Sequence, residues 1–191
     1  MTGIILAGGE NRRMGTDKAF LDVGGKPLIE HILAVFSDLF AKTIIVTNTP
    51  DRYRSYDAQV VIDAFDQRGP MTGIYSGLLH SRDEVNFIAA CDMPFLNGRL
   101  IGHLAGLVEG YDAVVPKVNG FAEPLHAVYG RRILPRIESQ LRGGEQRIQE
   151  LFRTIRVRYL SEAEIVRFDP LMRSFKNINT PEEYKEAVCS D

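Results

Sequence analysis

The residues best suited to chemistry lie in one short loop near the N-terminus. An apolar segment, residues 4–7, runs into the glycine pair Gly8-Gly9, and the loop that follows carries three cationic side chains. These cations are Arg12, Arg13 and Lys18. Glycines let the main chain approach a ligand closely with its N–H groups exposed, and arginine or lysine side chains neutralise phosphate groups. The loop therefore predicts a binding site for a nucleotide.

Two common phosphate-binding signatures do not describe this loop. A P-loop places lysine and then serine or threonine directly after its second glycine, whereas Thr16-Asp17 separates Gly15 from Lys18. A dinucleotide-binding fingerprint needs the spacing G-x-G-x-x-G, which the loop lacks. The sequence indicates a nucleotide site of another type. The alternative is a tight strand-to-helix turn with solvated charges.

A carboxylate follows a second apolar segment. Residues 87–91 are apolar, Asp92 comes directly after them, and Pro94 prevents a strand from continuing. In an open parallel sheet, ligands bind outside the carboxyl ends of the strands. A carboxylate at that place suits Mg²⁺, which takes one or two protein carboxylates besides phosphate oxygens and water. Asp92 is therefore a candidate ligand of Mg²⁺ as the cofactor, and a helix N-cap or a turn aspartate is an equal alternative at this point.

The N-terminal loop resembles a signature of one enzyme family. The signature L-A-G-G-x-x-x-R-M-G-x-D-K belongs to the molybdenum cofactor guanylyltransferases, which are nucleotidyltransferases with a glycosyltransferase-A-like fold. The matching residues are Leu6, Ala7, Gly8, Gly9, Arg13, Met14, Gly15, Asp17 and Lys18. Similar segments at residues 61–74, 91–96, 123–129 and 175–183 follow in the family's order, so the resemblance spans nearly the whole chain.

The resemblance implies contacts to the nucleotide from several strand ends. Residues 61–73 are similar to the family's third strand and G-P-x-x-G helix entry, so Asp63 is expected to contact the nucleotide, with Asp66 as a nearby alternative. Thr47 and Asn48 end the preceding expected strand, and their side chains are able to hydrogen-bond guanine or ribose. The complete set expected at the nucleotide is Leu6, Ala7, Gly8, Gly9, Lys18, Thr47, Asn48, Asp63 and Asp92.

Two later segments are candidates for the site of the acceptor substrate. Residues 123–129 resemble the family's E-P-L-x-A-x-Y strand, in which Glu123 or His126 is a candidate contact. A histidine that alternates with apolar residues is more often a packed strand residue than a catalyst. Asn177 and Asn179 are separated by one residue, so an extended main chain places both amides on one side. Their segment resembles the family's F-x-N-[IV]-N-T-P-E-[ED], and both are expected to bind the acceptor.

A helix cap is the alternative for this last segment. Thr180, Pro181 and Glu183 predict a capping box with proline at the first helical position. Asn179 and Thr180 would then serve only the cap. Both interpretations can hold together, because a cap needs only one of the two residues.

The order of apolar patterns predicts an α/β fold. Strand patterns alternate with helical ones, as expected for one Rossmann-like, mostly parallel sheet with helices on both faces. The expected strands are residues 4–6, 43–47, 60–62, 87–91, 113–115, 125–129 and 157–160. The first expected helix is residues 27–39, with Pro27 in its first turn, and the second follows a break at residues 69–73 and runs to about residue 81. The other expected helices are residues 99–109, 133–141, 146–152 and a last one after residue 179.

Composition limits the class of protein. The chain has 191 residues, 45% of them hydrophobic and 25% charged, which predicts a single domain over residues 1–191 with a sizeable core. A net charge of -2 with scattered basic residues argues against a nucleic-acid partner. The sequence has neither a secretory signal nor an apolar span of membrane length, so we expect a cytoplasmic protein with no membrane partner. Cys91 and Cys189 predict neither a disulfide nor a zinc site.

The resemblance implies transfer of GMP from GTP to the phosphate of molybdopterin, or of its molybdenum form, with release of pyrophosphate. Arg13, Lys18 and Asp92 are the expected catalytic residues: the cations would stabilise charge on the phosphates, and Asp92 would bind the metal. An ionised acceptor phosphate requires no general base. GTP and molybdopterin are the expected partners, together with transient cofactor-delivery or acceptor proteins. The alternatives are a nucleotidyltransferase that uses CTP or a sugar-phosphate acceptor, and a GTP-binding accessory protein without turnover.

Overall fold

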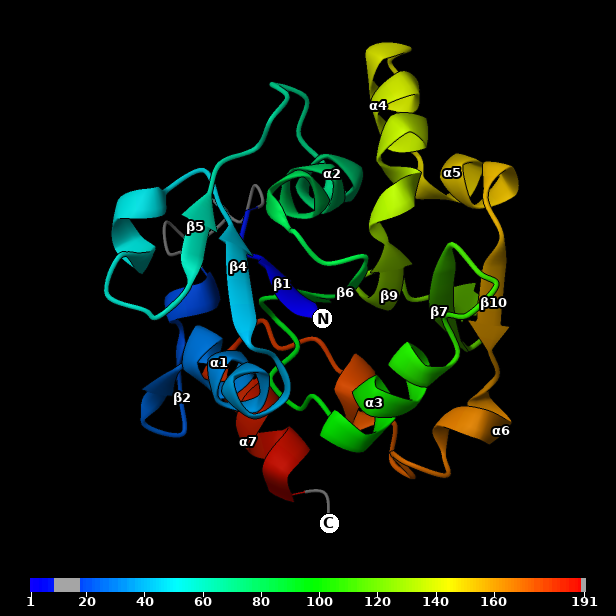
Figure 1. Ribbon diagram of the computed structural model, residues 1–191. Helices are drawn as coiled ribbons and strands as arrows, with labels where there is room; N and C mark the ends of the chain where they lie inside the picture. The colour runs from blue at the N-terminus through cyan, green and yellow to red at the C-terminus, as the bar shows by residue number, and fades with distance from the viewer. Residues whose placement is uncertain (9–17, 190–191) are drawn as a thin grey trace.

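The computed structural model describes residues 1–8 and 18–189, and an eight-stranded sheet lies at its centre (Figure 1). The strands follow the order β10-β7-β9-β6-β1-β4-β5, and β8 pairs with β7. Their bounds are β1 (Thr2–Leu6), β4 (Lys42–Val46), β5 (Gln59–Val61), β6 (Val85–Ala90), β7 (Ala113–Val118), β8 (Phe121–Ala122), β9 (His126–Gly130) and β10 (Val157–Leu160).

Most neighbouring strands of the sheet run parallel. Parallel pairing joins β5, β4, β1 and β6, and it also joins β7 to β10. Strand β9 runs antiparallel between β6 and β7. The chain turns back after β7 through Asn119 and Gly120, with φ of 51° and 80°, and positive φ at two adjacent positions suits a tight hairpin. The predicted mostly parallel α/β sheet is confirmed, with β9 and the short β8 as antiparallel exceptions.

Helices cover both faces of the sheet, as predicted (Figure 1). They are α1 (Leu28–Leu39), α2 (Pro70–His80), α3 (Gly98–Gly106), α4 (Leu134–Arg142), α5 (Ile148–Thr154), α6 (Glu162–Ile165) and α7 (Pro181–Cys189). Short 3-10 helices cover Lys18–Phe20, Pro50–Tyr53, Arg131–Ile133 and Arg173–Phe175. Of the helices in the described part of the chain, none combines the length and the apolar character needed to cross a membrane.

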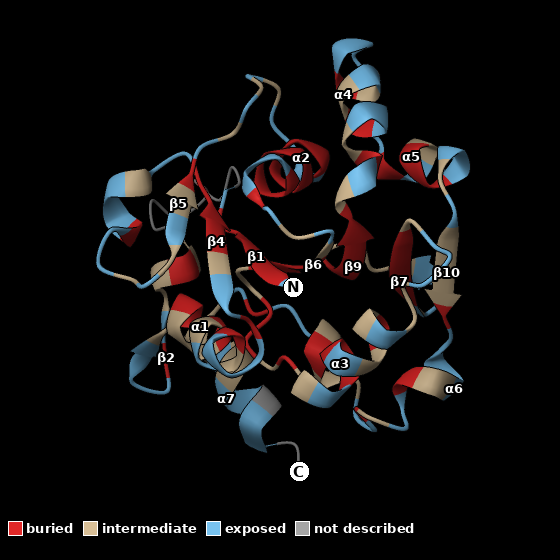
Figure 2. Cartoon of the chain, viewed as in Figure 1, coloured by how far each residue is buried: buried red, intermediate tan, exposed pale blue. Residues whose placement is uncertain are grey.

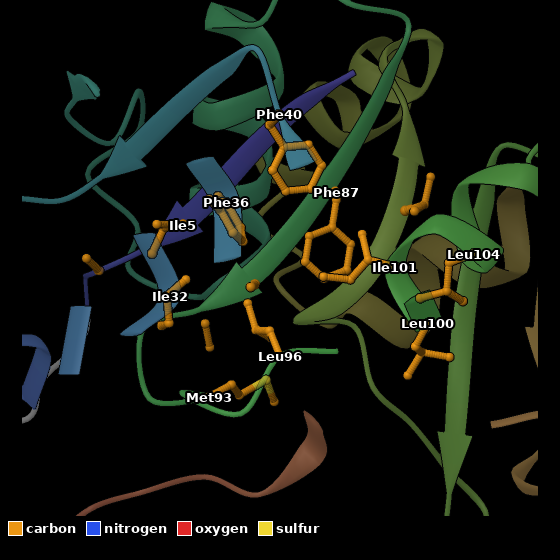
Figure 3. Packing of buried hydrophobic residues seen from close by; sticks show 14 of the residues in the cluster. Ile5, Ile32, Phe36, Phe40, Phe87, Met93, Leu96, Leu100, Ile101 and Leu104 are labelled. Atoms are coloured by element: carbon orange, nitrogen blue, oxygen red, sulfur yellow. The ribbon is translucent and has the colours of Figure 1, made fainter. Parts of the chain in front are cut away.

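Two apolar layers hold the helices against the sheet. Ile5 of β1 belongs to the layer that contains Phe36 of α1 and Ile101 of α3 (Figure 3). Its neighbour Ile4 belongs to the opposite layer, together with Ile74 of α2 and Ile137 of α4. Successive side chains of a strand point to opposite faces, so a strand covered on both faces must be apolar at every position. Figure 2 shows the result, with buried central strands and exposed outer surfaces of the helices.

A small hairpin precedes α1 and was not expected from the sequence. Strand β2 (Asp22–Val23) pairs with β3 (Lys26–Pro27) around Gly24 and Gly25, whose φ angles are 65° and 83°. Pro27 therefore ends the hairpin and stands at the N-cap position of α1, whereas we expected it in the first turn of the helix. Strands of two residues are too short to show an apolar period, which explains why sequence reasoning missed them.

Candidate active site

A cavity of about 910 Å³ opens at the carboxyl ends of the parallel strands. Open α/β sheets bind their ligands at this edge. The segments that follow β1, β4 and β6 form its wall, together with the segment that precedes β9. Among the residues expected at the site, those that line the cavity are Leu6, Ala7, Gly8, Lys18, Thr47, Asn48, Asp63, Asp92, Glu123 and Asn177.

The register of the strands brings these segments together. Leu6 pairs with Val46 of β4 on one side and with Ala90 of β6 on the other. Main-chain hydrogen bonds continue one residue past these pairs, at 2.8 Å between β1 and β4 and at 3.1 Å between β6 and β1. The residues that follow the three strands therefore emerge side by side.

One end of the cavity carries a polar pair. Asn48 donates a hydrogen bond from Nδ2 to Asp63 Oδ2 at 2.9 Å. Gly8 lies close to this pair, because a Cβ at Gly8 would stand 3.9 Å from Asn48 Nδ2 and 4.0 Å from Asp63 Oδ2. Thr47 is buried beside them and lines the cavity. Asp66, the alternative to Asp63, is exposed and does not line it.

The middle of the cavity carries a cation beside a carboxylate. Lys18 Nζ lies 3.9 Å from Asp92 Oδ2, and the two side chains are 24% and 22% exposed. Burial raises the pKa of the Asp92 carboxyl, and the nearby Lys18 ammonium counteracts part of that rise. Solvent therefore only partly stabilises the Asp92 charge. A bound cation would stabilise it further.

A main-chain hydrogen bond joins the C-terminal segment to Asp92. The N–H of Ile178 donates to the main-chain carbonyl of Asp92 at 2.8 Å. Asn177 lines the cavity. Asn179 does not line it, but its Oδ1 accepts a hydrogen bond from Nζ of Lys18, which does. The residues on either side of the buried Ile178 thus lie at the cavity wall and beside Lys18, and their binding of the acceptor stays a prediction.

The cap of α7 differs in one detail from the expected capping box. Thr180 Oγ1 accepts the N–H of Glu183 at 3.2 Å, as a cap should. The Glu183 carboxylate, however, accepts the N–H of Asn179 at 2.6 Å, one residue before the cap. Asn179 and Thr180 therefore both take part in the start of the helix.

The two acceptor candidates near β9 lie in different surroundings. Glu123 lines the cavity, burial raises the pKa of its carboxyl, and no described residue hydrogen-bonds that carboxylate. His126 is fully buried, with its ring centroid 5.1 Å from Phe87 and 4.8 Å from Phe175. Neither ring nitrogen has a partner among the described residues, and burial lowers the pKa of His126 to about 3. His126 is therefore a packed strand residue, and Glu123 is the residue that faces the cavity.

Sequence reasoning missed two arginines of the cavity wall. Arg52 lies in the 3-10 helix after β4 and stands 4.1 Å from the centroid of the Phe20 ring. Arg68 lies between β5 and α2. Both follow strands that end at the cavity, so their position relative to those strands was the signal that could have identified them.

Several expected residues lie outside the described part of the chain. They are Gly9, Arg12, Arg13, Met14, Gly15 and Asp17. Within residues 1–8 and 18–189, no three His, Cys, Asp or Glu side chains come together as a metal cluster. Asp63, Asp92 and Glu123 line the cavity without forming such a cluster, so Asp92 would be a single carboxylate ligand of a metal. A lone carboxylate fits Mg²⁺ that takes its other ligands from phosphate oxygens and water.

Comparisons with known proteins identify the family and the fold. Residues 3–162 match the MobA-like NTP transferase domain. The chain is 42% identical to the molybdenum cofactor guanylyltransferase of Desulfosudis oleivorans, over 100% of this chain and 95% of that protein. Its structure is similar to molybdopterin-guanine dinucleotide biosynthesis protein A from Archaeoglobus fulgidus, with a TM-score of 0.85, 31% identity and coverage of 100% and 99%. The 2-C-methyl-D-erythritol 4-phosphate cytidylyltransferase from Thermus thermophilus shares the fold, with a TM-score of 0.70, 17% identity and coverage of 97% and 96%.

Proposed function

Because this chain belongs to the MobA-like NTP transferase family, among the molybdenum cofactor guanylyltransferases, we propose that it transfers GMP from GTP to the phosphate of molybdopterin. One observation carries the proposal: a single cavity joins the Asn48–Asp63 pair, the Lys18–Asp92 pair and Asn177. A nucleotide and a second substrate would share such a cavity, with the transferred phosphate between them.

The Asn48–Asp63 end is proposed to bind the base. Guanine presents two adjacent donors, the N1–H and the 2-amino group, and a carboxylate accepts both. Cytosine presents a ring acceptor at the equivalent edge and would face Asp63 with a lone pair. Asn48 holds the Asp63 carboxylate by its 2.9 Å hydrogen bond, and Gly8 leaves space beside both side chains. Leu6, Ala7, Gly9 and Thr47 complete the proposed nucleotide site.

Lys18 is proposed to contact the phosphates, together with Arg13. A lysine ammonium placed where negative charge grows stabilises the transition state more than the bound substrate. Asp92 would hold Mg²⁺, which when bound neutralises charge on the triphosphate oxygens. No protein nucleophile is needed, because the acceptor phosphate is itself the nucleophile.

The proposed reaction is one displacement at the α-phosphorus of GTP. The bond that forms joins an oxygen of the acceptor phosphate to this phosphorus. The bond that breaks joins the phosphorus to the oxygen shared with the β-phosphate, and its electron pair leaves with pyrophosphate. Catalysis then consists of positioning and charge stabilisation.

The acceptor is proposed to bind between β9 and the C-terminal segment. Asn177 lines this part of the cavity, and Asn179 is hydrogen-bonded to Lys18 in the cavity wall. Glu123 offers a half-buried carboxylate without a partner among the described residues. A carboxylate in that condition suits a ligand with N–H donors, which the amino-substituted ring of a pterin provides.

A direct test combines the purified protein with molybdopterin, Mg²⁺ and each nucleoside triphosphate in turn, and measures pyrophosphate release. We expect rapid release with GTP and little with CTP, ATP or UTP. Equal release with CTP would favour the cytidylyltransferase alternative. Tight GTP binding without pyrophosphate release would favour the accessory-protein alternative.

A further inference from the structure

The side chain of Lys18 is held by a residue far away in the sequence. Lys18 Nζ donates a hydrogen bond to Asn179 Oδ1 and lies 3.9 Å from Asp92 Oδ2. A lysine side chain has four rotatable bonds and loses much conformational freedom when its end is fixed. The Asn179 oxygen therefore selects one position of the ammonium out of many.

The Asn179 amide is oriented in turn by Glu183. Glu183 Oε2 accepts the main-chain N–H of Asn179 at 2.6 Å and its side-chain Nδ2 at 3.2 Å. An amide has its donors on one end and its acceptor on the other, and an ammonium has only donors. The carboxylate thus fixes the amide with Oδ1 toward Lys18. The reverse orientation would bring Nδ2 against the ammonium and the oxygen against a carboxylate.

Further contacts hold Glu183 in position and keep its carboxylate ionised. Its N–H donates to Thr180 Oγ1 at 3.2 Å in the first turn of α7. The main-chain N–H of Asn179, followed by its side chain, lowers the pKa of the Glu183 carboxyl, which keeps it ionised at neutral pH. The next residue, Tyr184, stacks on Phe95 with ring centroids 5.3 Å apart. These contacts hold the start of α7 against the segment that follows Asp92.

We propose that Asn179 and Glu183 are positioning residues for Lys18. Glu183 orients the Asn179 amide, and the amide oxygen places the Lys18 ammonium beside Asp92, where it meets the phosphates of the nucleotide. Asn179 then acts on the reaction through Lys18 and not through a direct contact with the acceptor. This inference rests on the proposed function, because it gives Lys18 a role at the phosphates.

The first test is a double-mutant cycle on guanylyl transfer at saturating GTP and molybdopterin. Asn179→Ala in the natural chain is expected to lower kcat by about 10- to 100-fold, as a small misplacement of a catalytic group does, with little change in KM for GTP. In the Lys18→Ala background, Asn179→Ala is expected to change kcat less than about twofold. Equal fold-losses in the two backgrounds would overturn the proposal. So would a rise in the KM for molybdopterin as the main effect of Asn179→Ala in both.

The second test uses two substitutions at Glu183. Glu183→Gln retains an oxygen that accepts both donors of Asn179, so it should keep most of the kcat, whereas Glu183→Ala should lower it as Asn179→Ala does. Glu182→Ala is the matched control, because it removes a negative charge from the same helix turn, and no described residue hydrogen-bonds Glu182. A loss of kcat in Glu182→Ala as large as that in Glu183→Ala would assign the effect to destabilised α7.

A third measurement does not depend on turnover. The rate of Lys18 acetylation by a small amine-reactive reagent, read by mass spectrometry, should rise in Asn179→Ala and Glu183→Ala and stay unchanged in Glu182→Ala. An unchanged rate in all three variants would contradict the positioning role even if the protein forms no guanylylated product. Absence of product from the natural chain, with the labelling rates as expected, would instead contradict only the proposed function.

Discussion

The main-chain carbonyl of Asp92 accepts the N–H of Ile178 at 2.8 Å, which joins the end of β6 to the C-terminal segment. This hydrogen bond places Asn177 and Asn179 close to the Lys18–Asp92 pair, which comes from the first half of the chain. The fully buried Ile178 side chain anchors the segment from the other side. The arrangement explains how the last motif of the sequence contributes to the same cavity as the first.

Substitution of Asp63 tests base recognition. Asp63→Asn replaces one acceptor oxygen with a donor, so one guanine N–H would lose its partner. A buried unpaired polar group costs about 1–3 kcal/mol, which corresponds to about 5- to 150-fold weaker GTP binding. Isothermal titration with GTP measures this effect. Asp66→Asn is the control, since Asp66 is exposed and outside the cavity. If both variants bind GTP equally well, Asp63 does not contact the base.

Substitution of Asp92 separates a metal ligand from a turn residue. Asp92→Asn keeps the shape and cap capacity of the side chain but removes its charge. Because the buried carboxyl already has a raised pKa, loss of the charge should leave the melting temperature unchanged or slightly higher. Guanylyl transfer should nevertheless collapse at every Mg²⁺ concentration tested. A much lower melting temperature, with full activity in the folded fraction, would make Asp92 a structural residue.

Because His126 is buried, we expect the folded protein to lose stability in acid. Its pKa is about 3 in the folded protein, far below the value of about 6.5 for an unfolded chain. Between these values the unfolded state binds a proton that the folded state does not, so stability falls as the pH drops from 6.5 toward 3. At pH 5 this single group costs about 2 kcal/mol relative to neutral pH.

The measurement compares urea unfolding of the natural chain and of His126→Leu at pH 7 and pH 5. Leucine is similar in volume and does not titrate, so the variant should lose about 2 kcal/mol less on acidification. Other groups titrate equally in both proteins and cancel in the difference. If both proteins lose the same stability, His126 is not a buried neutral group.

Much of the site could be predicted from the sequence, because it lies where apolar segments end. Leu6, Val46 and Ala90 pair in neighbouring strands, so the polar residues that follow them must meet. The periodicity of the apolar residues and the positions of the strand ends were enough to predict that Asn48 and Asp92 lie at one cavity. The same reasoning could have identified Arg52, which follows β4 at the cavity wall.

Contacts between distant segments could not be predicted in this way. The hydrogen bond from Lys18 to Asn179 joins residues 161 positions apart, and no local pattern specifies such a pair. The hydrogen bond from the N–H of Asn179 to the Glu183 carboxylate also depends on how the segment before α7 packs on Asp92. The burial of His126 between two aromatic rings follows from the packing of Phe175 on β9.

Asn177 offers a test of the acceptor site that leaves the cap of α7 intact. Its side chain lines the cavity, whereas the cap uses Thr180 and Glu183. Asn177→Ala should raise the KM for molybdopterin about tenfold, as expected for one lost hydrogen bond, while GTP affinity and melting temperature stay unchanged. A normal KM for molybdopterin would exclude Asn177, and Glu123→Gln would then be the variant to examine.

Transfer of label from GTP reports guanylyl transfer itself. The protein is incubated with Mg²⁺, molybdopterin and GTP that is radiolabelled at either the α- or the γ-phosphate, and the products are separated by chromatography. We expect the α-label to move into a guanylylated molybdopterin and the γ-label to appear in pyrophosphate. The Lys18→Ala variant should form both products more slowly and still bind GTP. Label that stays in GTP, or α-label released only as free GMP, would contradict guanylyl transfer to molybdopterin.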